Sequence, residues 1–504
     1  MLPIRRRGMR LGPVLLLLLA AQAGAAAPAA APVALSAAQA REDVQLAADA
    51  AEAALTDPFW HQSREEWTAA RASALAEAEK ARDPMRVYAI VATLMAHLGE
   101  GHLTVRPPAA AIEHQRRTAA VLPLDLHWSG EGIFVVAGHG DAADIAHGSR
   151  LLSIDGEGED ALLAELASMI PRDGRILTGP MRDGAGKGYA VLRHRRRGDE
   201  ARFELRWRAP DGTVVQRTAA AFPLRRWPAA KDEEESRVAT LEWLAPSLAY
   251  LVVPSFSNRV YRAAGLDFRD EMRRIFEELR RGRATRLILD LRQNGGGSEP
   301  NESILFSHLV AEPLRKYAAV EARGEELAVS SRSGRRYDHR VFDADELNFQ
   351  QLLPDGRLSR LNVPPEGLMT HWEPATPVFS GRLVVLAGGA TFSGGAELAS
   401  MLYHVRRGVF VGEETGGAHE GNASGYTWEI ELPHSGVRLH LPLLQFRFAW
   451  PGLPRNRGVP PDCAAPPRVE EIGVRRDRAW RIARDVVEQE WATPDEARCP
   501  AAAD

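Results

Sequence analysis

The fold of this chain is decided by residues 382–403, which read Arg382-LVVLAGGATFSGGAELASML-Tyr403. Residues 383–387 are apolar and rich in branched side chains, which is typical of a strand buried on both faces. Apolar side chains then recur with helical spacing at Leu398, Met401, Leu402 and Val405. The segment therefore predicts a buried strand, a glycine-rich turn and a helix.

Ser393 falls at the turn between this strand and this helix, and Gly394 and Gly395 open the helix. That placement holds the hydroxyl out of the sheet and directs free backbone N–H groups at whatever the hydroxyl attacks. Acyl transfer needs this arrangement. A turn that only caps the helix would use the same residues, so the neighbouring motifs have to decide between the two interpretations.

A second glycine-rich motif, DLRQNGGG at residues 290–297, follows another predicted strand. Consecutive glycines let the backbone approach a substrate, and their N–H groups can stabilise an oxyanion. The Gly-Lys-Ser/Thr ending of a phosphate-binding loop is missing, because Ser298 follows a glycine. A plain strand-exit turn is the other interpretation. If the two strands are neighbours, the N–H groups of Gly295, Gly296 and Gly394 are the expected oxyanion donors.

Composition places the chain among ordinary folded proteins, with 504 residues, 45% hydrophobic and 26% charged residues. Its net charge of −4 gives no electrostatic reason to expect nucleic acid as a partner. Residues 1–27 combine an arginine-rich start, a short apolar run and small residues, which predicts a signal peptide; an uncleaved anchor is the alternative. We expect an exported protein, periplasmic or extracellular, without a membrane span in the mature chain.

The chain has two cysteines, Cys463 and Cys499. In an exported protein they could pair and tie down the C-terminal helix, or they could remain free. Two cysteines without an HExxH or CxxC motif cannot form a zinc site. We expect no metal and no cofactor.

Five regions follow from the pattern of apolar residues and turns. They are the signal peptide (1–27), a helical region (36–110), a small β-rich domain (118–225), an α/β core (237–470), and a C-terminal helix and tail (471–504). The β-rich domain should contain strands at 133–137, 150–154, 189–193 and 201–207. Within the core, 318–377 is polar and is predicted to be an irregular insertion or lid. A hairpin is expected from 426 to 441.

Seven motifs occur together in one order along the chain. They are LGEGHLTV (98–105), GSRLLSIDG (148–156), AYLVVPSFSN (249–258), LILDLRQNGGG (287–297), TFSGGAE (391–397), VGEETGG (411–417) and RGVPPD (457–462). In this set the chain resembles the serine peptidase family that includes the C-terminal-processing (tail-specific) proteases, the core of tricorn protease and the retinoid-binding interphotoreceptor repeats. The resemblance implies a crotonase-like α/β core, a PDZ-like domain and an N-terminal helical part, with Ser393 at the nucleophile position.

The resemblance also bears on the base that activates Ser393. The lysine of the C-terminal-processing branch would fall on or near Ala418, and no lysine follows Lys316. In the tricorn-like branch the base is a histidine from the N-terminal region, and His102 matches its position. An imidazole titrates near neutrality and suits proton abstraction from serine. The chain is therefore closer to the Ser/His branch.

The group that orients His102 is left open by the sequence. The tricorn-like branch has a serine where this chain has Gly101, and a glutamate where this chain has residues 454–457, PRNR. Glu100 and Glu397 are the two alternatives, although Glu397 is equally explained by a helix N-terminus and Glu100 by a solvated surface. Thr415 is expected to shape the loop beside the nucleophile.

The function implied is that of an exported serine-type endopeptidase, a hydrolase that cleaves unstructured or C-terminal polypeptide segments held by strand addition to the β-rich domain. The alternative is a non-catalytic protein that binds a peptide or an apolar ligand on the same fold. An α/β-hydrolase esterase fits less well, because GxSxG is absent around Ser393. The sequence does not indicate the natural substrate or the oligomeric state.

Overall fold

A six-stranded sheet forms the centre of the core in this computed structural model, which describes residues 34–228, 237–362, 368–450 and 452–500. The strand order is β10 (Thr240–Ala245), β11 (Leu248–Val252), β12 (Arg286–Asp290), β20 (Arg382–Ala387), β21 (Val409–Gly412) and β24 (Cys463–Ala464). Only β10 runs antiparallel to its neighbour. The predicted signal peptide lies outside the described residues.

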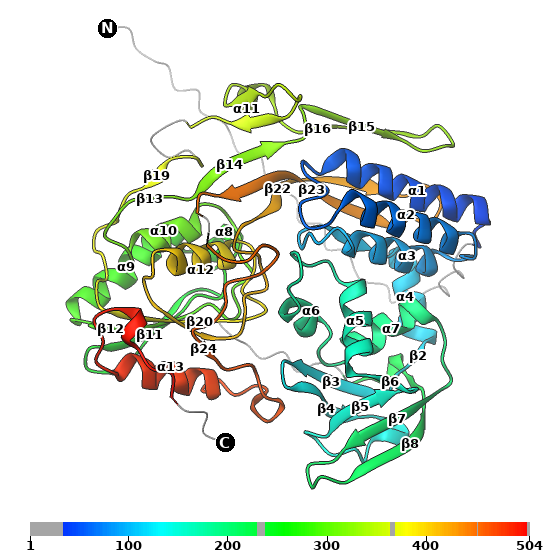
Figure 1. The fold of residues 1–504 in the computed structure, drawn as a ribbon, viewed down its shortest axis with the longest axis horizontal. Coiled ribbons are helices and arrows are strands. Elements are labelled where there is room, and N and C mark those ends of the chain that lie inside the picture. The colour runs from blue at the N-terminus through cyan, green and yellow to red at the C-terminus, as the bar shows by residue number, and fades with distance from the viewer. Residues whose placement is uncertain (1–33, 229–236, 363–367, 451, 501–504) are drawn as a thin grey trace, which may run out of the picture.

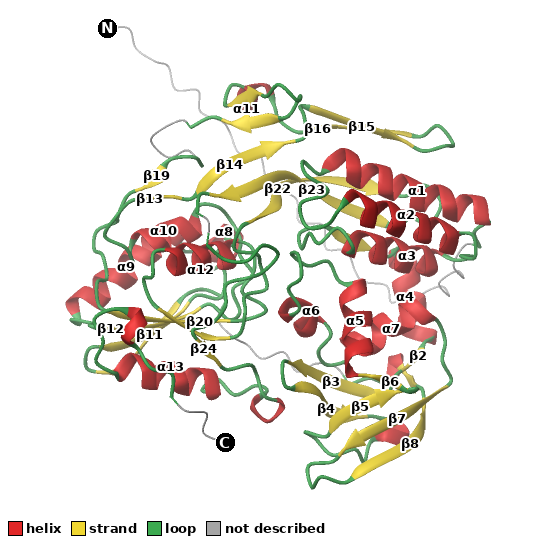
Figure 2. Ribbon diagram, viewed as in Figure 1, coloured by secondary structure: helices red, strands yellow, loops and turns green. Residues whose placement is uncertain are grey.

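Both faces of this sheet are covered by helices, as Figure 2 shows. Leu248 and Tyr250 of β11 pack with α13 (Arg478–Glu488), whereas Ala249 and Leu251 share a core with α9 (Phe268–Arg281) and α12 (Gly394–His404). Burial on both faces explains why these strands are continuous apolar runs. The structure confirms the predicted strand, turn and helix around Ser393, except that Val405 ends α12 with an exposed side chain.

A second six-stranded sheet packs against the N-terminal helices (Figure 1). Its strands are β1 (Thr104–Arg106), β23 (Arg438–Phe448), β14 (Tyr317–Ala322), β18 (Leu358–Arg360) and β17 (Gln350–Leu352), with β22 (Gly421–Glu431) also paired to β23. The helices are α1 (Ala37–Ala54), α2 (Arg64–Ala78) and α3 (Pro84–Ala96). The expected hairpin is confirmed, since β22 and β23 pair antiparallel.

The β-rich region has a sheet and a hydrophobic core of its own. Its strands are β3 (Leu124–Ser129), β4 (Gly132–Gly138), β5 (Arg150–Ile154), β6 (Glu157–Gly158), β7 (Arg202–Arg208) and β8 (Val214–Ala220), with α5 (Glu159–Met169) beside them. The strand predicted at 189–193 is wrong, because these residues lie in α7 (Gly188–Arg197). Tyr189 and Arg193 are four residues apart and both buried, which is a helical spacing that a five-residue window cannot distinguish from a strand.

The prediction of an irregular segment at 318–377 is also wrong for its described residues. The strands β14, β17 and β18 belong to the second sheet, and β15 (Glu326–Ser330) pairs with β16 (Arg336–Arg340). Side chains of β16 alternate between exposed and half-buried, so this strand contains no apolar run that would identify it.

The remaining elements are short. They are α4 (Ala109–Thr118), β2 (Ala120–Val121), α6 (Thr178–Asp183), β9 (Phe222–Pro223), α8 (Asn258–Ala263), α10 (Asn301–Ser307), β13 (Leu314–Arg315), α11 (Ala344–Leu347) and β19 (His371–Trp372). In the part of the chain with described coordinates, no helix has both the length and the hydrophobicity needed to cross a membrane.

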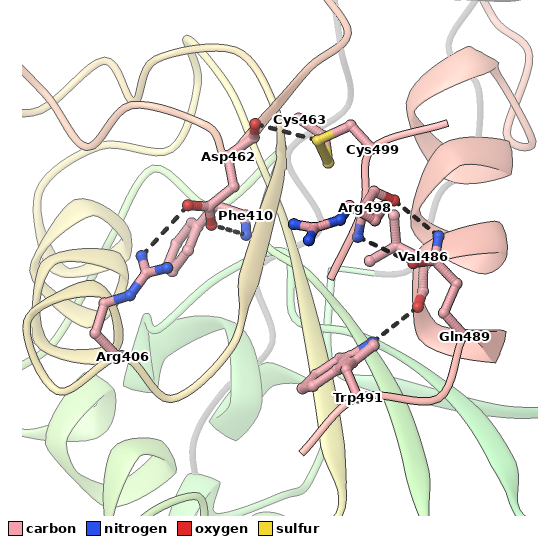
Figure 3. Close-up of a disulfide and its surroundings, with 9 residues drawn as sticks. All are labelled: Arg406, Phe410, Asp462, Cys463, Val486, Gln489, Trp491, Arg498 and Cys499. Atoms are coloured by element: carbon pink, nitrogen blue, oxygen red, sulfur yellow. Dashed lines mark hydrogen bonds and ion pairs between the residues drawn. A yellow bond between two sulfur atoms is a disulfide. The ribbon is translucent and has the colours of Figure 1, made fainter. Parts of the chain in front are cut away.

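Cys463 and Cys499 form a disulfide, which decides between the two alternatives left open by the sequence. The bond joins β24 to the segment after α13 (Figure 3). Two further contacts hold this segment: Trp491 Nε1–H donates to the Val486 carbonyl, and Gln489 and Arg498 exchange two hydrogen bonds. The disulfide therefore fastens the C-terminal segment to the edge of the core sheet.

We expect the double variant Cys463→Ser/Cys499→Ser to lose about 2–4 kcal/mol of unfolding free energy, because the disulfide closes a long loop in the unfolded chain. The bridged residues are 36 positions apart. Urea unfolding with and without dithiothreitol measures the loss, and the double variant is the control that should not respond to the reductant. An unfolding midpoint equal to that of the wild type would contradict the prediction.

Candidate active site

Ser393 stands at the start of α12 in a backbone conformation that side chains rarely adopt, with φ 50° and ψ −130°. Such a conformation costs about 1–3 kcal/mol and persists only where the surrounding structure holds it. The hydroxyl does not cap α12, and it forms no hydrogen bond with any described residue. The turn therefore presents a half-buried, unengaged hydroxyl at the N-terminus of a helix.

The loop after β12 lies directly beside this turn, because β12 and β20 are parallel neighbours. The Phe392 N–H donates to the Asn294 carbonyl at 3.0 Å. A Cβ at Gly296 would lie 2.7 Å from Ser393 Cβ and 2.8 Å from the Gly394 nitrogen, so only glycine fits there. The expected adjacency of the two glycine-rich loops is confirmed.

The three predicted oxyanion donors differ in whether their N–H group already donates a hydrogen bond within the protein. The Gly296 N–H donates to Asn294 Oδ1 at 2.8 Å and is not free, which corrects the prediction for that residue. The N–H groups of Gly295 and Gly394 donate no hydrogen bond within the described residues. Gly394 immediately follows Ser393, and a helix N-terminus favours negative charge. Gly394 and Gly295 are the remaining candidates for binding an oxyanion.

His102 packs against the residue that precedes Ser393. Its ring centroid lies 4.6 Å from that of Phe392, and the side chain is 17% exposed. Its Nε2 is buried and has no hydrogen-bond partner among the described residues, so no hydrogen bond joins it to Ser393. The structure thus brings the imidazole to the nucleophile turn without a bond to the hydroxyl.

Glu100 is the carboxylate that contacts this imidazole. Its Oε1 lies 3.3 Å from His102 Nδ1 and accepts the His102 N–H at 3.1 Å, while its Oε2 accepts the Ala423 N–H at 2.8 Å. It is only 4% exposed, so it is not a solvated surface residue. Because a carboxylate only accepts, Nδ1 must carry the proton, and the lone pair of the neutral ring is on Nε2.

Asp173, which the sequence analysis did not identify, completes a cluster with Glu100 and His102. It is 1% exposed, and its two oxygens accept the N–H groups of Gly101 at 2.8 Å and Ala418 at 3.0 Å. Burial, together with the charge of Glu100, raises the pKa of Asp173 to about 6. An aspartate before a glycine is common in turns, so the local sequence gave no sign of this position.

The same cluster sets the pKa of His102. Burial lowers that pKa, but the hydrogen bond and the charge of Glu100 outweigh the effect, and Asp173 and Glu397 add to it at longer range. The net result is a pKa of His102 above the usual histidine value. Its imidazole therefore holds a proton to a higher pH than an exposed histidine does.

No hydrogen bond or ion pair joins Glu397 to His102, which corrects its proposed role as the orienting group. It belongs instead to a buried cluster around Lys316. Lys316 Nζ lies 2.5 Å from Glu397, 2.6 Å from Glu302 and 3.1 Å from Glu299. Tyr317 and Asn422 donate further hydrogen bonds to Glu397. This cluster fixes the first turn of α12.

The charges around Lys316 also exclude it as a general base. Burial lowers the pKa of Lys316, but Glu299, Glu302 and Glu397 raise it more, and the pKa lies above the usual lysine value. The amine is therefore permanently protonated at physiological pH. Its ammonium also takes the position that a cation would take among these carboxylates. Glu100, His102 and Asp173 are a second group whose side chains could hold a cation. There, backbone N–H groups already donate hydrogen bonds to the carboxylate oxygens.

Thr415 lies in the loop after β21 and is fully buried. Its Oγ1 donates to the Gly417 carbonyl and accepts the Val459 N–H, both at 2.9 Å. A Cβ at Gly417 would lie 2.6 Å from Ala396 Cβ and 3.3 Å from the Ser393 nitrogen. Thr415 therefore holds a loop that packs against the nucleophile turn.

An α/β fold with a serine at a strand–helix turn is the arrangement expected of a serine peptidase. More specifically, residues 247–464 match peptidase family S41, so the chain carries a domain of that family. No curated protein matches its sequence.

Solved structures share its fold. Mature CPAF has a TM-score of 0.59 at 16% identity, covering 90% of this chain and 96% of CPAF. A CPAF mutant has a TM-score of 0.61 at 15% identity, with coverage of 90% and 98%. The photosystem II D1 C-terminal processing protease aligns less well, with a TM-score of 0.39 at 17% identity over 90% and 99% of the two chains.

If His102 acts as the base, the acid limb of kcat/KM should have its midpoint above about 6.5, because the base works only when neutral. Glu100→Gln removes the charge that raises the pKa, so the midpoint should move to lower pH and the rate should fall by about 10²-fold or more. The measurement is a pH profile of peptide hydrolysis. The control is Glu113→Gln, which changes a surface carboxylate paired with Arg116. An unchanged profile and rate in Glu100→Gln would exclude this role.

Lys316→Met should destabilise the fold by about 3–5 kcal/mol, because it leaves buried carboxylates without their cation. Urea unfolding measures the effect. Lys187→Met, at an exposed position before α7, is the matched control and should unfold like the wild type. Equal stability of the two variants would show that the ammonium does not hold this cluster together.

Proposed function

We propose that the chain is an exported serine endopeptidase in which His102, oriented by Glu100, deprotonates Ser393. The hydroxyl oxygen attacks a peptide carbonyl, and the N–H groups of Gly394 and Gly295 stabilise the oxyanion that forms. His102 then gives its proton to the leaving amine, and water releases the acyl-enzyme by the reverse sequence. The observation that carries this proposal is the unengaged Ser393 hydroxyl beside an imidazole whose Nε2 has no partner.

The contact between His102 and Ser393 has to close when substrate binds. Catalytic hydrogen bonds are often long in ligand-free enzymes and tighten in the substrate complex. The His102 ring packs against Phe392, one residue before the nucleophile. In this proposal the loop or the ring moves when substrate binds, and Nε2 then accepts a hydrogen bond from the hydroxyl.

The substrate in this proposal is an unstructured or C-terminal polypeptide segment. The β-rich domain, proposed to be PDZ-like, would hold such a segment by strand addition, and the central domain would be crotonase-like. Two features support export: the leader-like residues 1–27 and the disulfide between Cys463 and Cys499, which is typical of oxidising compartments.

A non-catalytic binding protein is the second candidate, and the missing hydrogen bond between His102 and Ser393 favours it. The two candidates differ in one cheap observation. A fluorophosphonate labels a serine only where the hydroxyl is activated, so labelling at Ser393 supports the peptidase, and no labelling of folded protein supports the binding protein.

Ser393→Ala should abolish hydrolysis of an unfolded protein substrate and fluorophosphonate labelling, with unchanged circular dichroism and melting temperature. The expected loss is on the order of 10⁵-fold or more, since the covalent step depends on this one oxygen. Ser168→Ala, in α5 of the β-rich domain, is the control and should retain full activity. Cleavage at the wild-type rate by Ser393→Ala would refute the assignment.

A further inference from the structure

Asp173 joins three parts of the chain that are distant in sequence. It lies between α5 and α6 of the β-rich domain. One carboxylate oxygen accepts the Gly101 N–H, next to His102, and the other accepts the Ala418 N–H, in the loop after β21. Since that loop packs against the Ser393 turn, a single buried carboxylate connects the loop of the base to the loop of the nucleophile.

The residues after Asp173 extend this connection. The Gly174 N–H donates to the Gly99 carbonyl at 2.8 Å, and the Arg175 N–H donates to the Asn456 carbonyl at 3.0 Å. Gly99 belongs to the loop of His102, whereas Asn456 belongs to the core. The segment 173–175 therefore binds both sides through its backbone as well as through the carboxylate.

Further along, α6 contacts the two glycine-rich loops of the core. A Cβ at Gly389 would lie 2.4 Å from the Thr178 carbonyl oxygen, and Arg182 donates to Gln293 Oε1 at 3.0 Å. Gly389 precedes the Ser393 turn, and Gln293 precedes the oxyanion loop. The β-rich domain thus lies against every loop that the proposed site uses.

We propose that Asp173 is a positioning residue, through which the β-rich domain holds His102 in register with Ser393. This inference rests on the proposed peptidase function. Asp173 forms no hydrogen bond to the His102 ring or to Ser393, so it acts through the two backbone N–H groups that it binds. Hydrogen bonds from N–H groups to a carboxylate are stronger than neutral ones, and a buried N–H left without its acceptor is costly. The domain is then part of the catalytic assembly, in addition to any role in substrate binding.

Asp173→Asn tests the proposal, because the amide has the same shape but can accept only one of the two N–H groups. We expect kcat to fall at least about 10-fold with KM nearly unchanged, since small misplacements of catalytic groups cost up to about 10²-fold. Fluorophosphonate labelling of Ser393 should slow to the same extent. The acid limb of kcat/KM should move to lower pH, because the charge of Asp173 helps to raise the pKa of His102. A residue that only stabilises the fold would leave kcat, labelling and the acid limb unchanged in a variant that still folds.

Asp160→Asn, at an exposed position of α5, is the matched control and should behave as the wild type. If Asp173→Asn does not fold, Gly101→Ala tests the same contact from the other side. Its Cβ would lie 2.8 Å from Asp173 Oδ1 and 2.8 Å from the Phe392 ring, so kcat should fall here too. Wild-type kcat and labelling in the folded variant would overturn the positioning role alone. Failure of the wild type to hydrolyse and to label would overturn the proposed function itself.

Discussion

The parallel pairing of β12 with β20 is the contact on which the candidate site depends. Asp290 lies opposite Leu386, so both strands end at the same edge and their loops leave the sheet together. Asn294 then binds both loops, since its carbonyl accepts the Phe392 N–H and its side chain accepts the Gly296 N–H. A Cβ at Gly395 would lie 2.2 Å from the Asn294 carbonyl oxygen. Glycine is a steric requirement at this contact, and the contact supports the strained backbone of Ser393.

This part of the structure was predictable because its signals are local. A buried parallel strand is apolar throughout, and a loop packed closely against another loop needs glycine at the contact. Both requirements can be recognised in a few consecutive residues. The helix at 189–193 and the strands within 318–377 were missed for the opposite reason. In the helix the buried residues Tyr189 and Arg193 have a spacing that also fits one face of a strand, and in β16 the side chains are at most half-buried, so neither pattern identifies the element.

The partners of the site residues were not predictable, because tertiary packing alone creates them. Asp173 stands in an ordinary turn, and Lys316 stands between β13 and β14, with no spacing that relates either to Ser393. Glu397 is one helical turn from Ser393, yet its side chain points to Lys316 rather than to the imidazole. From the sequence, Glu100 and Glu397 were equal candidates for orienting His102. The direction in which each side chain points in the folded protein distinguishes them.

The two buried ionic clusters beside the nucleophile turn differ in whether their basic side chain can release its proton. Around Lys316, three carboxylates keep the ammonium charged, so this amine has no lone pair to accept a proton. At His102, two carboxylates lie beside an imidazole that can lose its proton, and in the neutral ring Glu100 leaves the lone pair on Nε2. That atom is buried without a partner, which costs free energy until a donor reaches it. A serine hydroxyl is such a donor, so closing the contact between His102 and Ser393 is favoured by the same burial that leaves Nε2 unpaired.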